Sequence, residues 1–210
     1  MKVLDILTED QQRLDEISFK QGLRAGAMIG AMALPSMINT QYQEPPPNIP
    51  KTVQSKQVNP KFEQLATEIA RTYKCDPKLA LEVVELAHKH ADPVFPTAQD
   101  IIHLIGVESS FNPTAVSGLK KDPAYGLTQI RPETNGLTRA DLQTPEAQII
   151  HGVKKLKHYF NRLKGDKNAT LQAYNIGLKN YLRGKKAPKY IKKFDVEQQR
   201  YASIDDRLRI

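Results

Sequence analysis

The chain has 210 residues, of which 40% are hydrophobic, and a formal net charge of +8. This length and apolar content exclude a protein that is disordered throughout, and they allow one folded domain with flanking segments. The single cysteine, Cys75, excludes an internal disulfide framework and argues against a cysteine-based zinc site.

An apolar segment without charges, residues 25–37, dominates the N-terminal arm that we place at residues 1–40. It is too short to span a membrane comfortably. Three glycines spaced by four residues indicate a helix face that packs closely, so we expect membrane or assembly contact through residues 22–38. A signal-peptide core and a flexible arm are the alternatives, although the five acids among residues 1–24 are atypical of an export signal.

Residues 41–60 contain five prolines and almost no large apolar side chains, which predicts an extended, semi-rigid linker. The folded domain should then span residues 61–210. The whole positive excess lies in this domain, and residues 151–193 alone carry thirteen Lys or Arg against one acid. Such a positively charged segment favours binding to an anionic polymer, for example cell-wall glycan, lipopolysaccharide or nucleic acid. A solvated helix surface without a specific partner is an equally good interpretation.

Hydrophobic residues in the domain recur at helical spacing, with start and stop signals at the ends of each stretch. The predicted helices run from Pro60 to Tyr73, from Pro77 to the prolines of "ADPVFP", from Thr97 to near Ser110, from Pro145 to Gly165 as the longest, and around residues 168–176 and 188–203. At most a small hairpin is expected near residues 125–131. The predicted fold is therefore all-α, a compact helical domain.

Glu108 lies on the apolar side of the third predicted helix. At about 100° per residue it falls within about 20° of Ile101, so we expect its carboxyl at the centre of the buried stripe. Burial and the nearby helix C-terminus disfavour the charged form, so the pKa of Glu108 should rise toward that of a general acid. An ion pair across the core, or a frayed last turn that reaches water, explains the position without a function.

Two later segments place uncharged hydrogen-bonding groups beside glycines, namely "YGLTQIRP" at residues 125–132 and "LQAYNIGLKNY" at residues 171–181. Gln129, Tyr174 and Asn175 are able to bind the hydroxyl and acetamido groups of a sugar without neutralising an acid. Together with Glu108 they predict a glycan site.

Four motifs in order resemble the catalytic domain of the soluble-type lytic transglycosylases, relatives of goose-type lysozyme, over residues 79–195. The motifs are "ESSFNP" from Glu108, "GLTQI" from Gly126, "AYNIG" from Ala173 and "PKYIKKF" from Pro188. The segment "DLQTPEAQIIHGVKKLKHY" also resembles a family helix, with Gln148 in place of an asparagine. Two further departures are a longer loop at residues 118–125 and Thr128 in place of a common methionine.

The resemblance implies a lysozyme-like domain with a cleft that cleaves the MurNAc–GlcNAc bond of peptidoglycan. It implies Glu108 as acid and then base, with the substrate's own N-acetyl group as nucleophile and a 1,6-anhydromuramoyl product. It implies no metal or organic cofactor. The residues implied to contact substrate are Ser117, Gln129, Tyr174, Asn175 and Tyr190.

Two other functions stay open. One is a lysozyme-type hydrolase with Asp122 as the partner that activates water, although an Asp-Pro in a turn fits a structural role better. The other is a non-catalytic glycan-binding module or virion structural protein. No specific nucleic acid is expected, because the basic segment lacks a recognition motif.

A metal site is not expected. Four residues of metal-ligand type lie near one another in the sequence: His88, His90, Asp92 and His103. Positions 88 and 90 do not share a helix face, so we expect surface or cap residues.

The arrangement of arm, linker and wall-cutting domain favours a bacteriophage particle protein that acts on the periplasmic cell wall. A bacterial periplasmic or inner-membrane-anchored enzyme is the alternative location.

Overall fold

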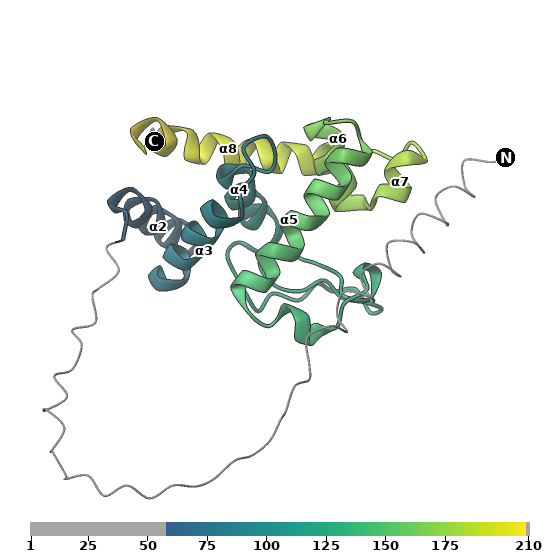
Figure 1. The fold of residues 1–210 in the computed structure, drawn as a ribbon, viewed down its shortest axis with the longest axis horizontal. Helices are drawn as coiled ribbons and strands as arrows, with labels where there is room; N and C mark the ends of the chain where they lie inside the picture. The colour runs from purple at the N-terminus through teal and green to yellow at the C-terminus, as the bar shows by residue number, and fades with distance from the viewer. Residues whose placement is uncertain (1–57, 209–210) are drawn as a thin grey trace, which may run out of the picture. The chain divides into compact units, whose positions relative to one another are not determined.

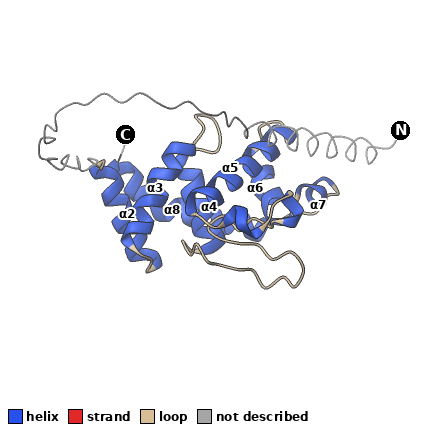
Figure 2. Ribbon diagram, turned by 60° about the horizontal axis from the view of Figure 1, so that its bottom comes forward, coloured by secondary structure: helices blue, strands red, loops and turns tan. Residues whose placement is uncertain are grey.

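The computed structural model describes residues 58–208, with side chains as far as residue 202, and this part of the chain folds into helices joined by loops (Figure 1). Figure 2 shows no strand among these residues, so the all-α prediction is confirmed. The predicted arm at residues 1–40, including residues 22–38, and nearly all of the linker at residues 41–60 lie outside the described residues.

The first two described helices begin where the capping signals predict. α2 (Pro60–Tyr73) follows Asn59, and α3 (Pro77–His90) follows Asp76. In each case the cap side chain accepts a hydrogen bond from the backbone N–H two residues on, at 3.0 Å and 2.8 Å respectively. Proline occupies the first turn of both helices, where no backbone donor is needed. The two helices pack against each other.

α4 (Ala98–Ser109) is the central helix of the domain. Thr97 and Asp100 form a capping box at its start. The helix lies between two hydrophobic clusters: Ile101 and Ile105 belong to one, built mainly with α2 and α3, and Leu104 belongs to the other. A helix that is covered on both sides has no single apolar stripe, which matters for the position of Glu108.

The loop between α4 and α5 contains two short 3-10 helices that the sequence did not predict, η1 (Glu133–Asn135) and η2 (Arg139–Leu142). At its centre Tyr125 pairs with both Val116 and Ile130 through isolated antiparallel bridges. This is the small hairpin expected near residues 125–131, in its shortest form.

The second half of the domain consists of α5 (Pro145–Arg162), α6 (Lys167–Ile176), α7 (Leu178–Leu182) and α8 (Pro188–Leu208). The prediction that the helix from Pro145 is the longest is wrong, because α8 has 21 residues and α5 has 18. The end of the helix predicted around residues 188–203 was placed where its apolar stripe ends. Polar residues continue α8 beyond that stripe, so the helix is longer than predicted. The sequence also did not predict α7. In the described residues no helix has the length and apolar content of a membrane span.

His103 is buried, with 4% of its surface exposed, so the prediction of a surface or cap residue is wrong for this position. Its ring stacks on Tyr201 and meets Phe194 edge-on, at centroid distances of 5.6 Å and 5.9 Å. Burial lowers the pKa of His103 to about 4, which makes it a neutral core residue at physiological pH. The prediction for His103 failed because α4 is covered by hydrophobic clusters on both sides. Within the described part of the chain no group of three or more His, Cys, Asp or Glu side chains could hold a metal ion.

Candidate active site

Glu108 lies in the last turn of α4, where the helix leaves the core. The residues from Ile101 to Gly106 are buried, whereas Val107, Glu108 and Ser109 are partly exposed. Glu108 as a residue is therefore partly exposed at the edge of the core, while its carboxyl is buried enough for burial to be the largest influence on its pKa.

The chain reverses direction directly after Glu108. Ser110 and Phe111 both adopt left-handed backbone conformations, with φ angles of 53° and 60°, and these end the helix. Phe111 is fully buried and packs on Tyr73, with ring centroids 4.7 Å apart. The Asn112 side chain accepts a hydrogen bond from the backbone N–H two residues on, at 2.9 Å. The motif "ESSFNP" thus anchors the end of α4 and thereby positions the carboxyl of Glu108.

Tyr190 contacts Glu108 directly. Its hydroxyl donates a hydrogen bond to Glu108 Oε1 at 2.5 Å, and its side chain is buried. The two residues meet because α8 packs against α4. The start of α8 is held to α6 by Ala187 N, which donates to Gln172 Oε1 at 2.8 Å. Burial raises the pKa of Tyr190 well above its ordinary value, so its hydroxyl keeps its proton and remains a donor.

Opposing influences set the charge of Glu108. Burial raises the pKa of this carboxyl, whereas the hydrogen bond from Tyr190 and the positive charges of Lys155 and Lys193 lower it. Burial is the largest influence, so the net shift is upward. Within the part of the chain that the structure describes, no carboxylate is among the charges that act on Glu108. The site therefore presents one carboxyl with the character of a general acid.

Lys155, a partly buried residue of α5, is not among the site residues that the sequence predicts. Its Nζ lies 4.2 Å from the centre of the Tyr174 ring. Burial lowers the pKa of Lys155 to about 8, while Glu108 raises it and Arg131 lowers it. The sequence gives one indication of this role, because Lys155 follows Gly152 by three residues and so lies on the same helix face. One lysine in a segment with thirteen cations gave no reason to select it.

Tyr174 is buried in α6, and its hydroxyl donates a hydrogen bond to Thr128 O at 2.7 Å. Burial raises its pKa well above the ordinary value, and the charge of Glu108 adds to this rise. Thr128 is also buried, and its hydroxyl donates to Gln148 O at 2.6 Å. The proton of Tyr174 is therefore engaged by the second motif, and only its oxygen lone pairs remain for a ligand. Its predicted contact with a sugar stays a prediction.

The second motif is a tight turn that requires glycine at position 126. Gly126 has a φ angle of 72°, and a Cβ atom there would lie 2.1 Å from Gln148 Cδ. The Gln129 amide donates to Gly126 O at 3.0 Å and to Ala115 O at 3.2 Å, which leaves its carbonyl oxygen for a ligand. Gln129 thus stabilises the turn in this structure, and its contact with the glycan stays a prediction.

Gln148, the departure from the family asparagine, ties three segments together at the start of α5. Its Oε1 accepts from Leu127 N at 2.7 Å, and its Nε2 donates to Pro113 O at 3.0 Å and to Leu142 O at 2.8 Å. The longer side chain therefore holds the loop after α4, the second motif and η2 in one arrangement.

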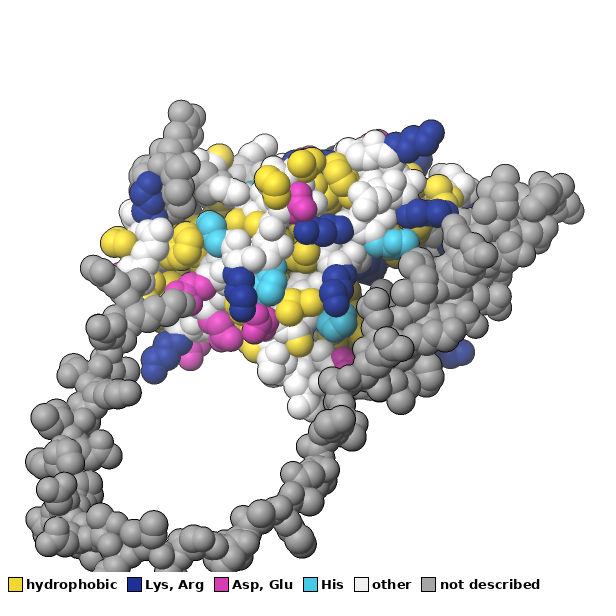
Figure 3. Space-filling view, in the orientation of Figure 1, with side chains coloured by type: hydrophobic (Ala, Val, Ile, Leu, Met, Phe, Trp, Pro, Cys, Tyr) yellow, Lys and Arg dark blue, Asp and Glu magenta, His cyan; other side chains and the backbone are white. Residues whose placement is uncertain are grey.

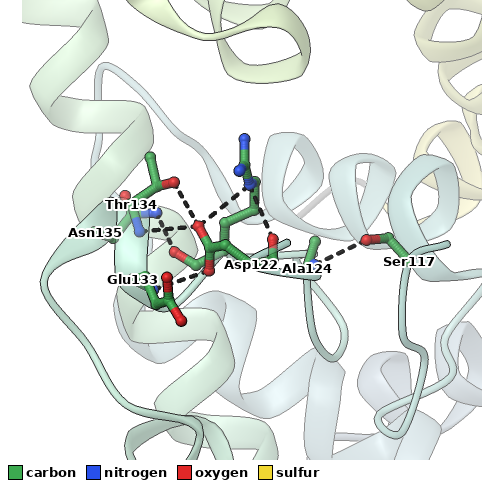
Figure 4. Close-up of polar contacts among 7 residues, drawn as sticks. Ser117, Asp122, Ala124, Glu133, Thr134 and Asn135 are labelled. Carbon is green, nitrogen blue, oxygen red and sulfur yellow. Dashed lines mark hydrogen bonds and ion pairs between the residues drawn. The ribbon is translucent and has the colours of Figure 1, made fainter. Parts of the chain in front are cut away.

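Figure 4 shows the polar contacts of Asp122 and Ser117 in the longer loop. Asp122 accepts hydrogen bonds from the backbone of Glu133 and of Thr134, both at 3.0 Å, and forms an ion pair with Arg131 at 3.3 Å. Burial alone would raise the pKa of Asp122, but these partners outweigh it and lower the pKa. The carboxylate holds the loop together, as the structural interpretation of an Asp-Pro predicts, and this argues against Asp122 as the base of a hydrolase.

Ser117 and Asn175 complete the predicted set of contact residues. The Ser117 hydroxyl accepts a hydrogen bond from Ala124 N at 2.8 Å, so it closes the longer loop. Asn175 is exposed in α6, and its side chain forms no hydrogen bond with another described residue. The structure brings Glu108, Tyr174 and Tyr190 together, whereas Ser117 and Gln129 bond within the loop. The substrate contacts of all five residues stay predictions.

The positive charge of the domain is spread over its surface. Figure 3 shows Lys and Arg side chains distributed across the face in view rather than gathered into one patch. Seven exposed cations lie between the start of α7 and the first turns of α8: Lys179, Arg183, Lys185, Lys186, Lys189, Lys192 and Lys193. An anionic polymer as partner therefore stays a prediction.

The family model described as Transglycosylase SLT domain matches residues 97–196. The matched segment begins at the cap of α4 and ends within α8, so it contains Glu108, Tyr174 and Tyr190. This match is consistent with a soluble lytic transglycosylase domain, as the resemblance predicts, and it supports lytic transglycosylase activity on peptidoglycan in general. No curated protein matches the chain.

Proposed function

We propose that the domain cleaves the MurNAc–GlcNAc bond of peptidoglycan with Glu108 as its only catalytic carboxyl and forms a 1,6-anhydromuramoyl product. One observation carries this proposal: Tyr190 donates a hydrogen bond to Glu108 in a site where no described carboxylate acts on that residue. Most glycosidases use two carboxylates, placed about 5–9.5 Å apart. A single carboxyl favours a substrate that supplies its own nucleophile.

In the first step, protonated Glu108 gives its proton to the glycosidic oxygen. The carbonyl oxygen of the muramoyl N-acetyl group attacks the anomeric carbon as the bond to the leaving oxygen breaks. Burial favours this step because it raises the pKa of Glu108 and so favours the protonated carboxyl. The hydrogen bond from Tyr190 holds one carboxyl oxygen, so the other is directed to the substrate.

In the second step, the Glu108 carboxylate takes the proton of the muramoyl C6 hydroxyl. The C6 oxygen bonds to the anomeric carbon and displaces the acetamido oxygen, which forms the 1,6-anhydro ring. Glu108 regains its proton, and neither step uses a metal or an organic cofactor. In this proposal Tyr174 and Asn175 orient the acetamido group and the sugar to be cleaved, while Gln129 and Ser117 hold the glycan.

The test is mass spectrometry of the muropeptides that the wild-type protein and Glu108→Gln release from purified peptidoglycan. We expect anhydromuramoyl products from the wild type and none from the variant. Reducing-end products from the wild type would show that water is the nucleophile and overturn the transglycosylase mechanism. Absence of any release would leave a glycan-binding or structural role.

The location that we propose for this activity is a bacteriophage particle that opens the periplasmic cell wall during infection. The support is the order of segments in the sequence: an apolar run at residues 25–37, a proline-rich linker at residues 41–60 and the wall-cutting domain. A bacterial periplasmic or membrane-anchored enzyme is the alternative. Removal of residues 1–40 should abolish incorporation into particles in the first case and membrane flotation in the second. Unchanged behaviour in both assays would contradict a role for the arm.

A further inference from the structure

One face of α5 is pressed against the second motif. Gln148, Gly152 and Lys155 follow at spacings of four and three residues, so they lie on the same side of the helix. At Gly152 an added Cβ atom would lie 2.7 Å from the Thr128 side chain, which shows how closely the helix backbone approaches this turn. The next position on this face is Lys155. The contacts at Gln148 and Gly152 therefore determine where the lysine side chain begins.

Lys155 lies on an aromatic surface that is itself fixed. Its Nζ is 4.2 Å from the centre of the Tyr174 ring, within the range of a cation–π interaction, and 5.8 Å from that of Tyr159. The Tyr174 ring is held at its edge by the hydrogen bond from its hydroxyl to Thr128 O. Among the residues that the structure describes, no carboxylate lies within ion-pair distance of the ammonium. The positive charge of Lys155 is thus fixed on the Tyr174 ring without an ion-pair partner in the described part of the chain, and it lowers the pKa of Glu108 while Glu108 raises that of Lys155.

We propose that Lys155 is a positioning residue of this site, whose ammonium on the face of Tyr174 stabilises the carboxylate that Glu108 becomes when it protonates the leaving oxygen. This inference rests on the proposed function of Glu108 as acid and then base. It adds a residue to the site that neither the sequence motifs nor the substrate-assisted mechanism assigns.

The physical need for such a cation follows from the burial of Glu108. Burial favours the protonated carboxyl before the reaction, and for the same reason it disfavours the carboxylate that forms during the reaction. A fixed positive charge nearby stabilises that carboxylate at the moment when it appears. Lys193 acts in the same direction, but its side chain is exposed, so solvent and salt screen it. Lys155 is partly buried and screened less.

The charge of Lys155 has its own pH limit. Its pKa is lowered to about 8 by burial and by Arg131, against the opposing effect of Glu108. As pH rises through about 8 the ammonium loses its proton and the site loses this cation. The tyrosines whose rings lie near it, Tyr174 and Tyr159, have pKa values that burial raises above the ordinary value, so both stay neutral there. Activity should therefore fall on the alkaline side as Lys155 is deprotonated.

The experiment compares Lys155→Met, Lys155→Arg and the control Lys154→Met, an exposed lysine of the same helix. Methionine keeps an unbranched side chain without charge, and arginine keeps the charge at all accessible pH values. Two measurements are made on each full-length protein: kcat and KM for release of anhydromuropeptides from pH 5 to 9.5, and the titration of the Glu108 carboxyl by carbon-13 NMR.

We expect Lys155→Met to lower kcat about 10-fold, with little change in KM, and to move the Glu108 titration to higher pH. Lys155→Arg should restore most of kcat and should move the alkaline fall in activity to higher pH. Lys154→Met should match the wild type in both measurements.

The inference is overturned if Lys155→Met leaves both kcat and the Glu108 titration unchanged, or if Lys155→Arg is as impaired as Lys155→Met. Failure of the proposed function has a different signature, since the wild type would then release no anhydro product. In that case the Glu108 titration alone decides whether Lys155 stabilises the carboxylate.

Discussion

Two carboxylates that precede the second motif in the chain, Glu108 and Asp122, have opposite environments. Glu108 has one hydrogen bond, from Tyr190, and its net pKa shift is upward because burial is the largest influence. Asp122 receives three hydrogen bonds, two from backbone N–H groups and one from the Thr134 hydroxyl, and its pKa is lowered. Asp122 is buried and Glu108 is partly exposed, so burial acts on both groups. The donors around Asp122, together with the charge of Arg131, outweigh burial and lower its pKa, whereas the single hydrogen bond and the lysine charges at Glu108 do not.

The comparison separates a group that is available for chemistry from one that is used for structure. A carboxylate whose lone pairs are all engaged gains nothing by taking a proton, because protonation would break its hydrogen bonds. A carboxyl with one free oxygen at the edge of the core is able to exchange its proton with a substrate. Four substitutions test this distinction, the first two at the site of Glu108 and the last two in the structure that supports it.

The largest effect is expected from Glu108→Gln. The amide oxygen can still accept the hydrogen bond from Tyr190, but the side chain has no acidic proton to transfer. General acid–base catalysis contributes about 10²- to 10⁴-fold, so we expect the rate of muropeptide release to fall about 10³-fold. Thermal unfolding should match the wild type within a few degrees. A variant that keeps its activity would remove Glu108 from the mechanism.

Tyr190→Phe should have the next largest effect. It removes the hydrogen bond to Glu108 and keeps the buried ring, so we expect about a 30-fold loss of kcat/KM, or ~2 kcal/mol. That hydrogen bond lowers the pKa of Glu108, so its loss raises the pKa, and the protonated form persists to higher pH. The pH profile of kcat/KM should move in that direction. A shift toward lower pH would contradict this account of Glu108.

Asp122→Asn should affect stability rather than chemistry. The amide puts N–H donors against the donors of Glu133 and Thr134, which should lower the free energy of unfolding by ~1.5 kcal/mol in urea titrations. The pKa of Asp122 is lowered in the folded state, so its contribution is complete above the unfolded pKa of about 3.9 and is lost as pH falls through the folded value. The difference from the wild type should shrink in acid. A large loss of activity at neutral pH would favour the hydrolase alternative.

Thr128→Val should have the smallest effect. It removes the hydroxyl that donates to Gln148 O and keeps the branched shape that packs on Gly152. We expect a loss of ~1 kcal/mol in unfolding free energy, measured by chemical denaturation. Anhydromuropeptide release should stay within about threefold of the wild type. A strong loss of kcat would show that the position of Tyr174 depends on this hydrogen bond more than the contacts indicate.

The sequence was sufficient for most of the helical framework and for the residue at the centre of the site. Capping residues such as Asn59, Asp76 and Thr97 predict helix starts because their hydrogen bonds are local. Glu108 was recognisable because a charged residue within an apolar helix conflicts with the local pattern. The short helices η1, η2 and α7 carry no apolar stripe long enough to be detected.

The tertiary structure alone decided which groups surround Glu108. Tyr190 and Lys155 come from α8 and α5, and their contacts depend on how these helices pack. The burial of His103 depends on α4 being covered from both sides, and the partial exposure of Glu108 depends on its position where α4 leaves the core. Local hydrogen bonds determine where a helix begins, so a sequence is enough to find them. Charge, exposure and pKa depend on neighbours that are distant in the chain, so only the packed structure determines them.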